Sequence, residues 1–204
     1  FFFFSDMDLM ELLKGQLGSG LMDQLSNQIG GDKQQTETAT NGILSTLIGA
    51  LSQNVTKPGG ADALAGALDK DHDGSILNDI SGFLGGNTQT QNPSTTNGAG
   101  ILSHILGDKL GGAAQMISQI SGLNGDQTGS LMTTLAPIVL GVLGQAKQQN
   151  GLDANGIAGL LGNTTQTQSG SNPFMGMVSQ FLDQNHDGNV MDDIVNMGMK
   201  FFSK

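Results

Sequence analysis

Two apolar stretches of the chain repeat each other, and the first of them has the period of a helix. "ILSTLIGALSQ" (residues 43–53) aligns with "LAPIVLGVLGQ" (135–145), and "ADALAGAL" (61–68) aligns with "ANGIAGLL" (154–161). Both alignments need nearly the same offset, about 92 positions, which indicates a duplicated unit. The apolar residues of the first stretch fall on one face at 3.6 spacing, and no alternating strand pattern is present. The sequence therefore predicts an all-α fold built from two pseudo-repeats of short helices.

Helical spacing of apolar residues continues elsewhere, with glycines at the ends of the segments. Residues 21–29 and 101–106 each place Leu, Ile or Met side chains on one face. Glycine is common just beyond the last turn of a helix because it adopts positive φ without strain. We therefore expect four glycines to end helices: Gly30, Gly85, Gly122 and Gly162.

The duplication also predicts how the chain is divided. The connection between the repeats and an insertion in the second repeat are rich in Thr, Gln and Asn, which is typical of mobile spacers. Alternating Thr and Gln also allow an edge strand as an alternative. We expect a tag or processed remnant ahead of Met7 (1–6), a first repeat (7–86), a polar linker (87–98) and a second repeat (99–204) with a polar insertion (163–173).

Each repeat ends in an acidic loop that begins like a calcium-binding loop: "DKDHDGSILNDI" (69–80) and "DQNHDGNVMDDI" (183–194). An EF-hand loop supplies side-chain oxygens at positions 1, 3 and 5, a glycine at 6, a carbonyl at 7 and a Glu at 12. Both loops instead have Ile at position 12 and Asp at position 11. A helix that begins one residue early would bring the Asp towards the ion and turn the Ile to the core. The predicted Ca²⁺ ligands are Asp69, Asp71, Asp73, Ser75 and Asp79 in the first loop, and Asp183, Asn185, Asp187, Asn189 and Asp193 in the second.

The acidic loops also have a simpler interpretation, in which the Asp-Gly turns only cap helices. Crowding several carboxylates into each of two loops favours a cation, because like charges repel without one. Oxygen ligands without sulfur favour Ca²⁺ over Zn²⁺. The short ligand set predicts a weak affinity, on the order of 10⁻⁴ M. His72 and His186, at position 4 of the loops, are expected to be solvated rather than ligands.

Composition excludes several classes of function. The net charge is −10, and the chain has no Cys and no Arg, the residue that most often recognises phosphate and base edges. We therefore expect no nucleic-acid partner, no disulfide and no thiolate metal site. The stretch around "LAPIVLGVLG" suits a buried core helix, so no transmembrane segment is expected. No nucleophile–base pair or cofactor motif is evident, and His104 is expected to be structural, so neither an enzyme nor a small-molecule substrate is predicted.

Several motifs resemble the YidB-like bacterial family of unknown function. They are "GILSHILGDKLGGAAQMISQISGL", "LMTTLAPIVLGVLGQ", "GLDANGIAGLLG" and the two EF-hand-like or dockerin-like loops. The resemblance covers nearly the whole chain as a tandem duplicate and implies an all-helical bacterial protein with acidic loops. It implies no activity. The first copy departs from the pattern, because it lacks the proline found at Pro137.

Two functions are compatible with these features. The first is a non-enzymatic, calcium-binding structural protein that assembles with copies of itself into an extracellular or surface fibre or matrix of a bacterium. The alternative is a calcium-dependent protein-binding module, whose ten Met residues would form an adaptable apolar surface. Acidity and lack of Cys suit export, and the cytoplasm is the alternative location.

Overall fold

The computed structural model describes residues 8–86 and 93–183 of the chain. Every regular element in these ranges is a helix, and no strand occurs in them, which confirms the all-α prediction. The α-helices are α1 (Leu9–Gln16), α2 (Ser19–Ile29), α3 (Lys33–Thr56), α4 (Gly60–Lys70), α5 (Ile80–Leu84), α6 (Gly98–Leu106), α7 (Leu110–Ser121), α8 (Gly125–Asn150), α9 (Ala154–Ser171) and α10 (Pro173–Asp183). Short 3-10 turns are η2 (Ser75–Asp79), η3 (Pro93–Thr96) and η4 (Gly107–Lys109).

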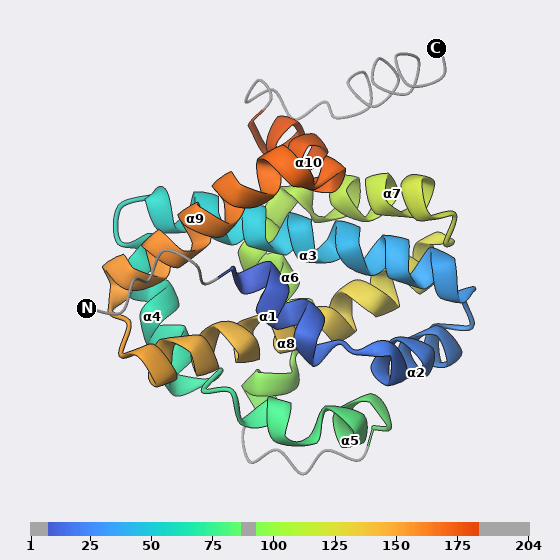
Figure 1. Cartoon of the computed structure of the whole chain (residues 1–204), viewed down its shortest axis with the longest axis horizontal. Helices are drawn as coiled ribbons and strands as arrows, with labels where there is room; N and C mark the ends of the chain where they lie inside the picture. Colours follow the sequence, from blue (N-terminus) through green and yellow to red (C-terminus); the bar gives the residue numbers. More distant parts are fainter. Residues whose placement is uncertain (1–7, 87–92, 184–204) are drawn as a thin grey trace.

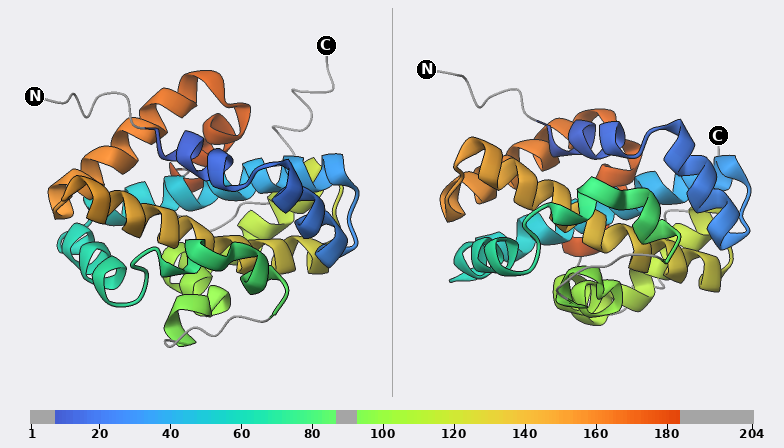
Figure 2. Two further views of the ribbon diagram at one scale, coloured as in Figure 1. Left: turned by 60° about the horizontal axis from the view of Figure 1, so that its bottom comes forward. Right: turned by 90° about the horizontal axis from the view of Figure 1, so that it is seen from below.

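Two long helices, α3 and α8, run through the middle of the molecule (Figure 1). They contain the aligned apolar stretches, and residues 42–51 and 135–144 are buried without a break. Helix α3 packs against α8 and also against α7, α9 and α10. Helix α8 packs most extensively against α6, which lies across one of its faces (Figure 2). Continuous burial replaces the one-sided pattern of a surface helix, because both helices are enclosed on all sides.

The described residues form one hydrophobic core rather than one core per half of the chain. Helix α3, from the first half, contacts α6, α7, α8, α9 and α10, all from the second half. Helix α4 likewise contacts both α8 and α9. Buried Leu, Ile, Val and Met side chains from both halves belong to the same cluster. The two halves therefore complete each other's core.

The ends of α3 and α8 have matching local structure. Asp32 caps the N-terminus of α3 and Asn124 caps that of α8, and each side chain accepts hydrogen bonds from backbone N–H groups. The helices that precede them, α2 and α7, both end at a left-handed glycine, Gly30 and Gly122, as predicted. Each pair is separated by about 92 positions, the offset found in the sequence.

Helix α6 docks on α8 where a proline opens the backbone. Pro137 lies inside α8 and has no N–H to donate to the carbonyl of Thr133, one turn earlier. Gly98, the first residue of α6, lies directly against this carbonyl, and a Cβ added to Gly98 would overlap the oxygen. The glycine therefore allows the close approach of α6 to the carbonyl that Pro137 leaves free.

The predicted spacer at 163–173 is mostly helical. It forms the second half of α9, and Gly162, expected to end a helix, lies in the interior of α9 instead. Thr164 is buried, and its hydroxyl accepts a hydrogen bond of 3.1 Å from the backbone N–H of Leu9. Gln168 donates to the carboxylate of Asp8, the residue that caps α1. Polar composition was misleading here because these side chains have partners on a distant helix.

Helix α8 has the length and hydropathy of a membrane-spanning helix. It is the one helix of the described residues that passes this test, and 72% of its apolar window is buried inside the protein. These properties are weak evidence for a membrane span, because the core helix of a folded domain has the same length and composition.

Candidate functional site

The first acidic loop lies between α4 and α5. Helix α4 extends as far as Lys70, so Asp69 is still helical. The chain then reverses at Gly74, whose φ of 90° is in the left-handed region that favours glycine. Just before it, the carboxylate of Asp73 accepts a hydrogen bond of 2.9 Å from the N–H of Ser75, which begins η2. The turn at positions 5 to 7 of the predicted calcium loop is thus present.

The loop is anchored on a glycine face of α8. A Cβ on Gly144 would overlap the carbonyl oxygen of His72, and one on Gly141 would lie 2.6 Å from a methyl of Ile76. Ile76 and Ile80 are buried, and burial of Ile80 agrees with the prediction that position 12 faces the core. The loop of the first half is therefore pressed against the central helix of the second half.

His72 lies inside this interface, where the sequence analysis expected a solvated side chain. It is 5% exposed, and its Nδ1 has no hydrogen-bond partner among the described residues. Burial lowers the pKa of His72, against the opposing effect of Asp71 and Asp73. The expectation was wrong because Gly141 and Gly144 of α8 have no side chain. The loop can therefore approach the helix closely, with the side chain at position 4 turned inward. His186, its counterpart, lies outside the described residues.

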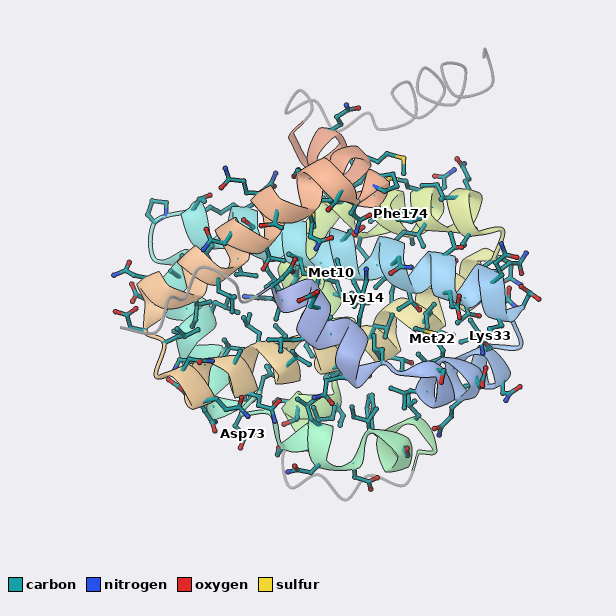
Figure 3. The ribbon with its side chains drawn as sticks, viewed as in Figure 1. Met10, Lys14, Met22, Lys33, Asp73 and Phe174 are labelled. Atoms are coloured by element: carbon teal, nitrogen blue, oxygen red, sulfur yellow. The ribbon has the colours of Figure 1, made fainter. Side chains whose placement is uncertain are left out.

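The carboxylates of the loop have separate partners. Asp69, at position 1, forms an ion pair with Lys147 of α8. Asp79, at position 11, caps α5 by accepting a hydrogen bond of 2.8 Å from the N–H of Gly82. The hydrogen bonds from Ser75 hold the pKa of Asp73 below its ordinary value, and Asp73 lies at the rim of the molecule (Figure 3). Asp79 thus does what the helix-cap interpretation predicted.

No group of three or more His, Asp or Glu side chains close enough to hold a metal together occurs in residues 8–86 and 93–183. In the described arrangement, the predicted ligands Asp69, Asp73 and Asp79 serve an ion pair and two local turns. Ser75 is exposed, and Asp71 is half-buried. Asp183 is the last residue of α10, and Asn185, Asp187, Asn189 and Asp193 lie outside the described residues.

The end of the polar linker also contacts the loop. Residues 93–96 form η3, and the hydroxyl of Thr95 donates a hydrogen bond of 2.7 Å to the carbonyl of Asp71. Sequence reasoning missed three residues that position the loop: Thr95, Gly144 and Lys147. Their only sequence signals were a Thr in a polar stretch, a Gly in an apolar helix and a Lys near a helix end, none of which indicates a partner.

A shallow depression of about 550 Å³ lies elsewhere, between the end of α2 and the start of α8. Gln28, Ser130, Thr133 and Thr134 line it together with two glycines, and Asp126 is the one ionisable residue in the lining. These groups offer hydrogen bonds without an acid–base pair. His104, the third histidine, is exposed on α6.

Comparison with known proteins places the chain in a family. The model of the family described as "Bacterial protein of unknown function (DUF937)" matches residues 11–146, from α1 almost to the end of α8. The chain belongs to this family. The DUF937 match includes the first loop and the helix on which it docks, and it ends before the second loop. A bacterial family of unknown function was predicted, whereas the specific YidB-like resemblance stays a prediction. No curated protein and no solved structure matches the chain.

Proposed function

We propose that this DUF937 protein is a non-enzymatic structural protein that binds calcium at its acidic loops and assembles with copies of itself. We place it at the surface or outside of a bacterial cell, where millimolar calcium matches a weak loop affinity. The observation that carries the proposal is the loop at residues 69–80, which joins the two halves of the core.

Two features of that loop support calcium as its ligand. Gly74 has the left-handed conformation that position 6 of a calcium loop requires, and Asp73 and Ser75 form the turn around it. Asp69, whose side chain is 58% exposed, is accessible from solvent. A cation would bind when the carboxylates of Asp69, Asp71 and Asp73 turn towards one another, with water as the remaining ligands.

The position of the loop supports a structural role. It belongs to the first half of the chain and is docked on Gly144 of the second half. A cation bound by the loop would therefore stabilise the contact between the halves. This role needs no catalytic group.

Assembly is supported by internal similarity. We propose that the two halves are tandem repeats, because their alignments, helix caps and left-handed glycines recur at about 92 positions. Related surfaces on the two halves allow one half to contact the other half of a neighbouring molecule. Contacts of this heterologous kind extend into a filament when the rotation does not close a ring.

Light scattering and negative-stain microscopy test the proposal during titration with millimolar CaCl₂ and then EGTA. We expect ordered polymers with calcium and their loss with EGTA. Asp73→Asn with Asp187→Asn should prevent assembly, because the amide lacks the charge, although its oxygen still accepts from Ser75. Asp108→Asn, at an exposed position outside the loops, is the matched control.

Two other outcomes contradict the proposal in different ways. A monodisperse monomer that binds calcium and exposes apolar surface would favour the calcium-dependent binding module. A protein that shows no calcium binding by isothermal titration calorimetry would leave the first loop as a helix cap and an ion pair.

A further inference from the structure

Lys147 is the residue that links α8 to the first position of the acidic loop. It forms an ion pair with Asp69, and the Lys147 side chain is 15% exposed whereas that of Asp69 is 58% exposed. The Lys33–Asp23 pair, by comparison, has side chains that are 49% and 56% exposed. Lys147 is thus largely enclosed, with its ammonium group directed to a carboxylate of the loop.

This contact has a specific position in the loop. Asp69 is position 1, which supplies the first carboxylate ligand in a calcium loop. Lys147 follows Gly144 by three residues, so both lie on the same side of α8. The loop backbone therefore contacts Gly144 through His72 while its first carboxylate contacts Lys147. One face of α8 provides both the close approach and the positive charge.

The loop needs positive charge in order to dock. Asp69, Asp71, Asp73 and Asp79 lie within eleven residues, with Lys70 as the one lysine among them. Repulsion between these carboxylates opposes a compact loop unless a cation lies nearby.

We propose that Lys147 is the internal cation of this loop. It holds the loop on α8 without metal, and a divalent cation must compete with it for Asp69. Lys147 thereby sets the calcium concentration at which the loop responds. This inference rests on the proposed calcium binding, which it deepens by naming the residue that controls its threshold.

The test is Lys147→Met, which keeps the length and apolar stem of the side chain but removes its charge. In EGTA we expect the melting temperature to fall by about 2–4 °C, as for loss of a partly exposed ion pair. In titration calorimetry we expect calcium to bind about three- to tenfold more tightly, because the competing charge is gone. Calcium should also raise the melting temperature of Lys147→Met by more than it raises that of the wild type.

Matched variants separate this inference from a general effect of removing a lysine. Lys147→Arg keeps the charge and should behave like the wild type in EGTA. Lys33→Met removes the lysine of the Lys33–Asp23 pair and should leave calcium affinity unchanged. In an Asp69→Asn background, Lys147→Met should have no further effect on the melting temperature in EGTA, because the pair is already lost.

The outcomes distinguish the inference from the proposed function. Calcium binding by the wild type with the same affinity in Lys147→Met overturns the inference and leaves the proposed function standing. Absence of calcium binding in the wild type and in every variant overturns both. If Lys147→Met does not fold, Lys147→Gln is measured instead under the same expectations.

Discussion

At the scale of single residues, the closest contacts between helices and loops are made at glycines, which have no side chain. The loop docks on Gly144, and α6 docks on Thr133 through Gly98. In both places a glycine lets a carbonyl oxygen approach to a distance that any Cβ would prevent. Replacing either glycine by alanine removes no contact. It should still lower the stability of the fold, because the added methyl group overlaps rigid backbone.

Gly144→Ala should therefore destabilise the protein by about 1–3 kcal/mol, the usual cost of forcing an extra carbon into a packed contact. Gly162→Ala is the control, because Gly162 is also inside a helix but has nothing within 4 Å of an added Cβ. That change should stabilise the protein by about 0.5–1 kcal/mol through helix propensity. Urea unfolding of both variants measures the difference, and equal effects would contradict the docking described here.

Burial of His72 predicts a dependence of stability on pH. The pKa of His72 is lowered in the folded protein, so the unfolded chain binds more protons in weak acid. The contribution of the neutral His72 to stability is fully present above the unfolded pKa of about 6.5. It is lost as the pH falls below that value towards the folded pKa. We expect the free energy of unfolding to fall between pH 7.5 and 5.5, and less steeply in His72→Gln. The same change at the exposed His104 serves as a control, and matching slopes for both variants would argue against a buried His72.

At the scale of elements, the start of α8 is connected to the end of α2. Asn124 and Gln127 form a capping box there, each side chain bonded to the other's backbone N–H. The amide of Gln127 also donates to the carbonyl of Gly30 at 2.9 Å, at the C-terminus of α2. The Gln127 side chain thus accepts a hydrogen bond from the N–H of Asn124 and donates one to a carbonyl at the end of α2.

Gln127→Ala should cost about 1–2 kcal/mol, because it removes a cap and leaves a helix-end carbonyl without this partner. Gln148→Ala, on an exposed turn of the same helix, should change stability by less than about 0.5 kcal/mol. Both are measured by urea unfolding at pH 7.5. Indistinguishable midpoints would show that the connection between α2 and α8 adds nothing to stability.

At the scale of the whole molecule, the halves are similar in sequence but do not form separate domains. Helix α3 packs against five helices of the second half, α6 to α10, and the first acidic loop docks on α8. Either half alone would expose the apolar surface that the other covers.

We therefore expect fragments 1–92 and 93–204 to lack cooperative unfolding when they are expressed separately. Each should give broad thermal transitions in circular dichroism and bind an apolar dye. Mixing them should restore helical signal and a single sharp transition, because the halves share one core. A fragment that unfolds cooperatively by itself would show that one half of the chain is an independent domain.

The sequence by itself determined the local features of this protein. Apolar spacing predicted helices at α2, α3 and α6, a continuous apolar stretch predicted the core helix α8, and glycine at a helix end predicted left-handed caps at Gly30 and Gly122. The Asp-Gly pattern of the loop predicted the turn at Gly74 and the burial of Ile80. These features depend on residues within one or two turns of each other, so the pattern contains all the information that they need.

Only the tertiary structure decided which distant groups meet. The polar second half of α9 is helical because Thr164 and Gln168 bond α1, more than 150 residues away in the chain. His72 is buried and Asp69 is paired because Gly144 and Lys147 lie on one side of a helix from the other half. Spacing cannot reveal such partners, since their proximity results from how α3 and α8 pack. The physical reason is that burial and ion pairing depend on distance in space, whereas a sequence records only separation along the chain.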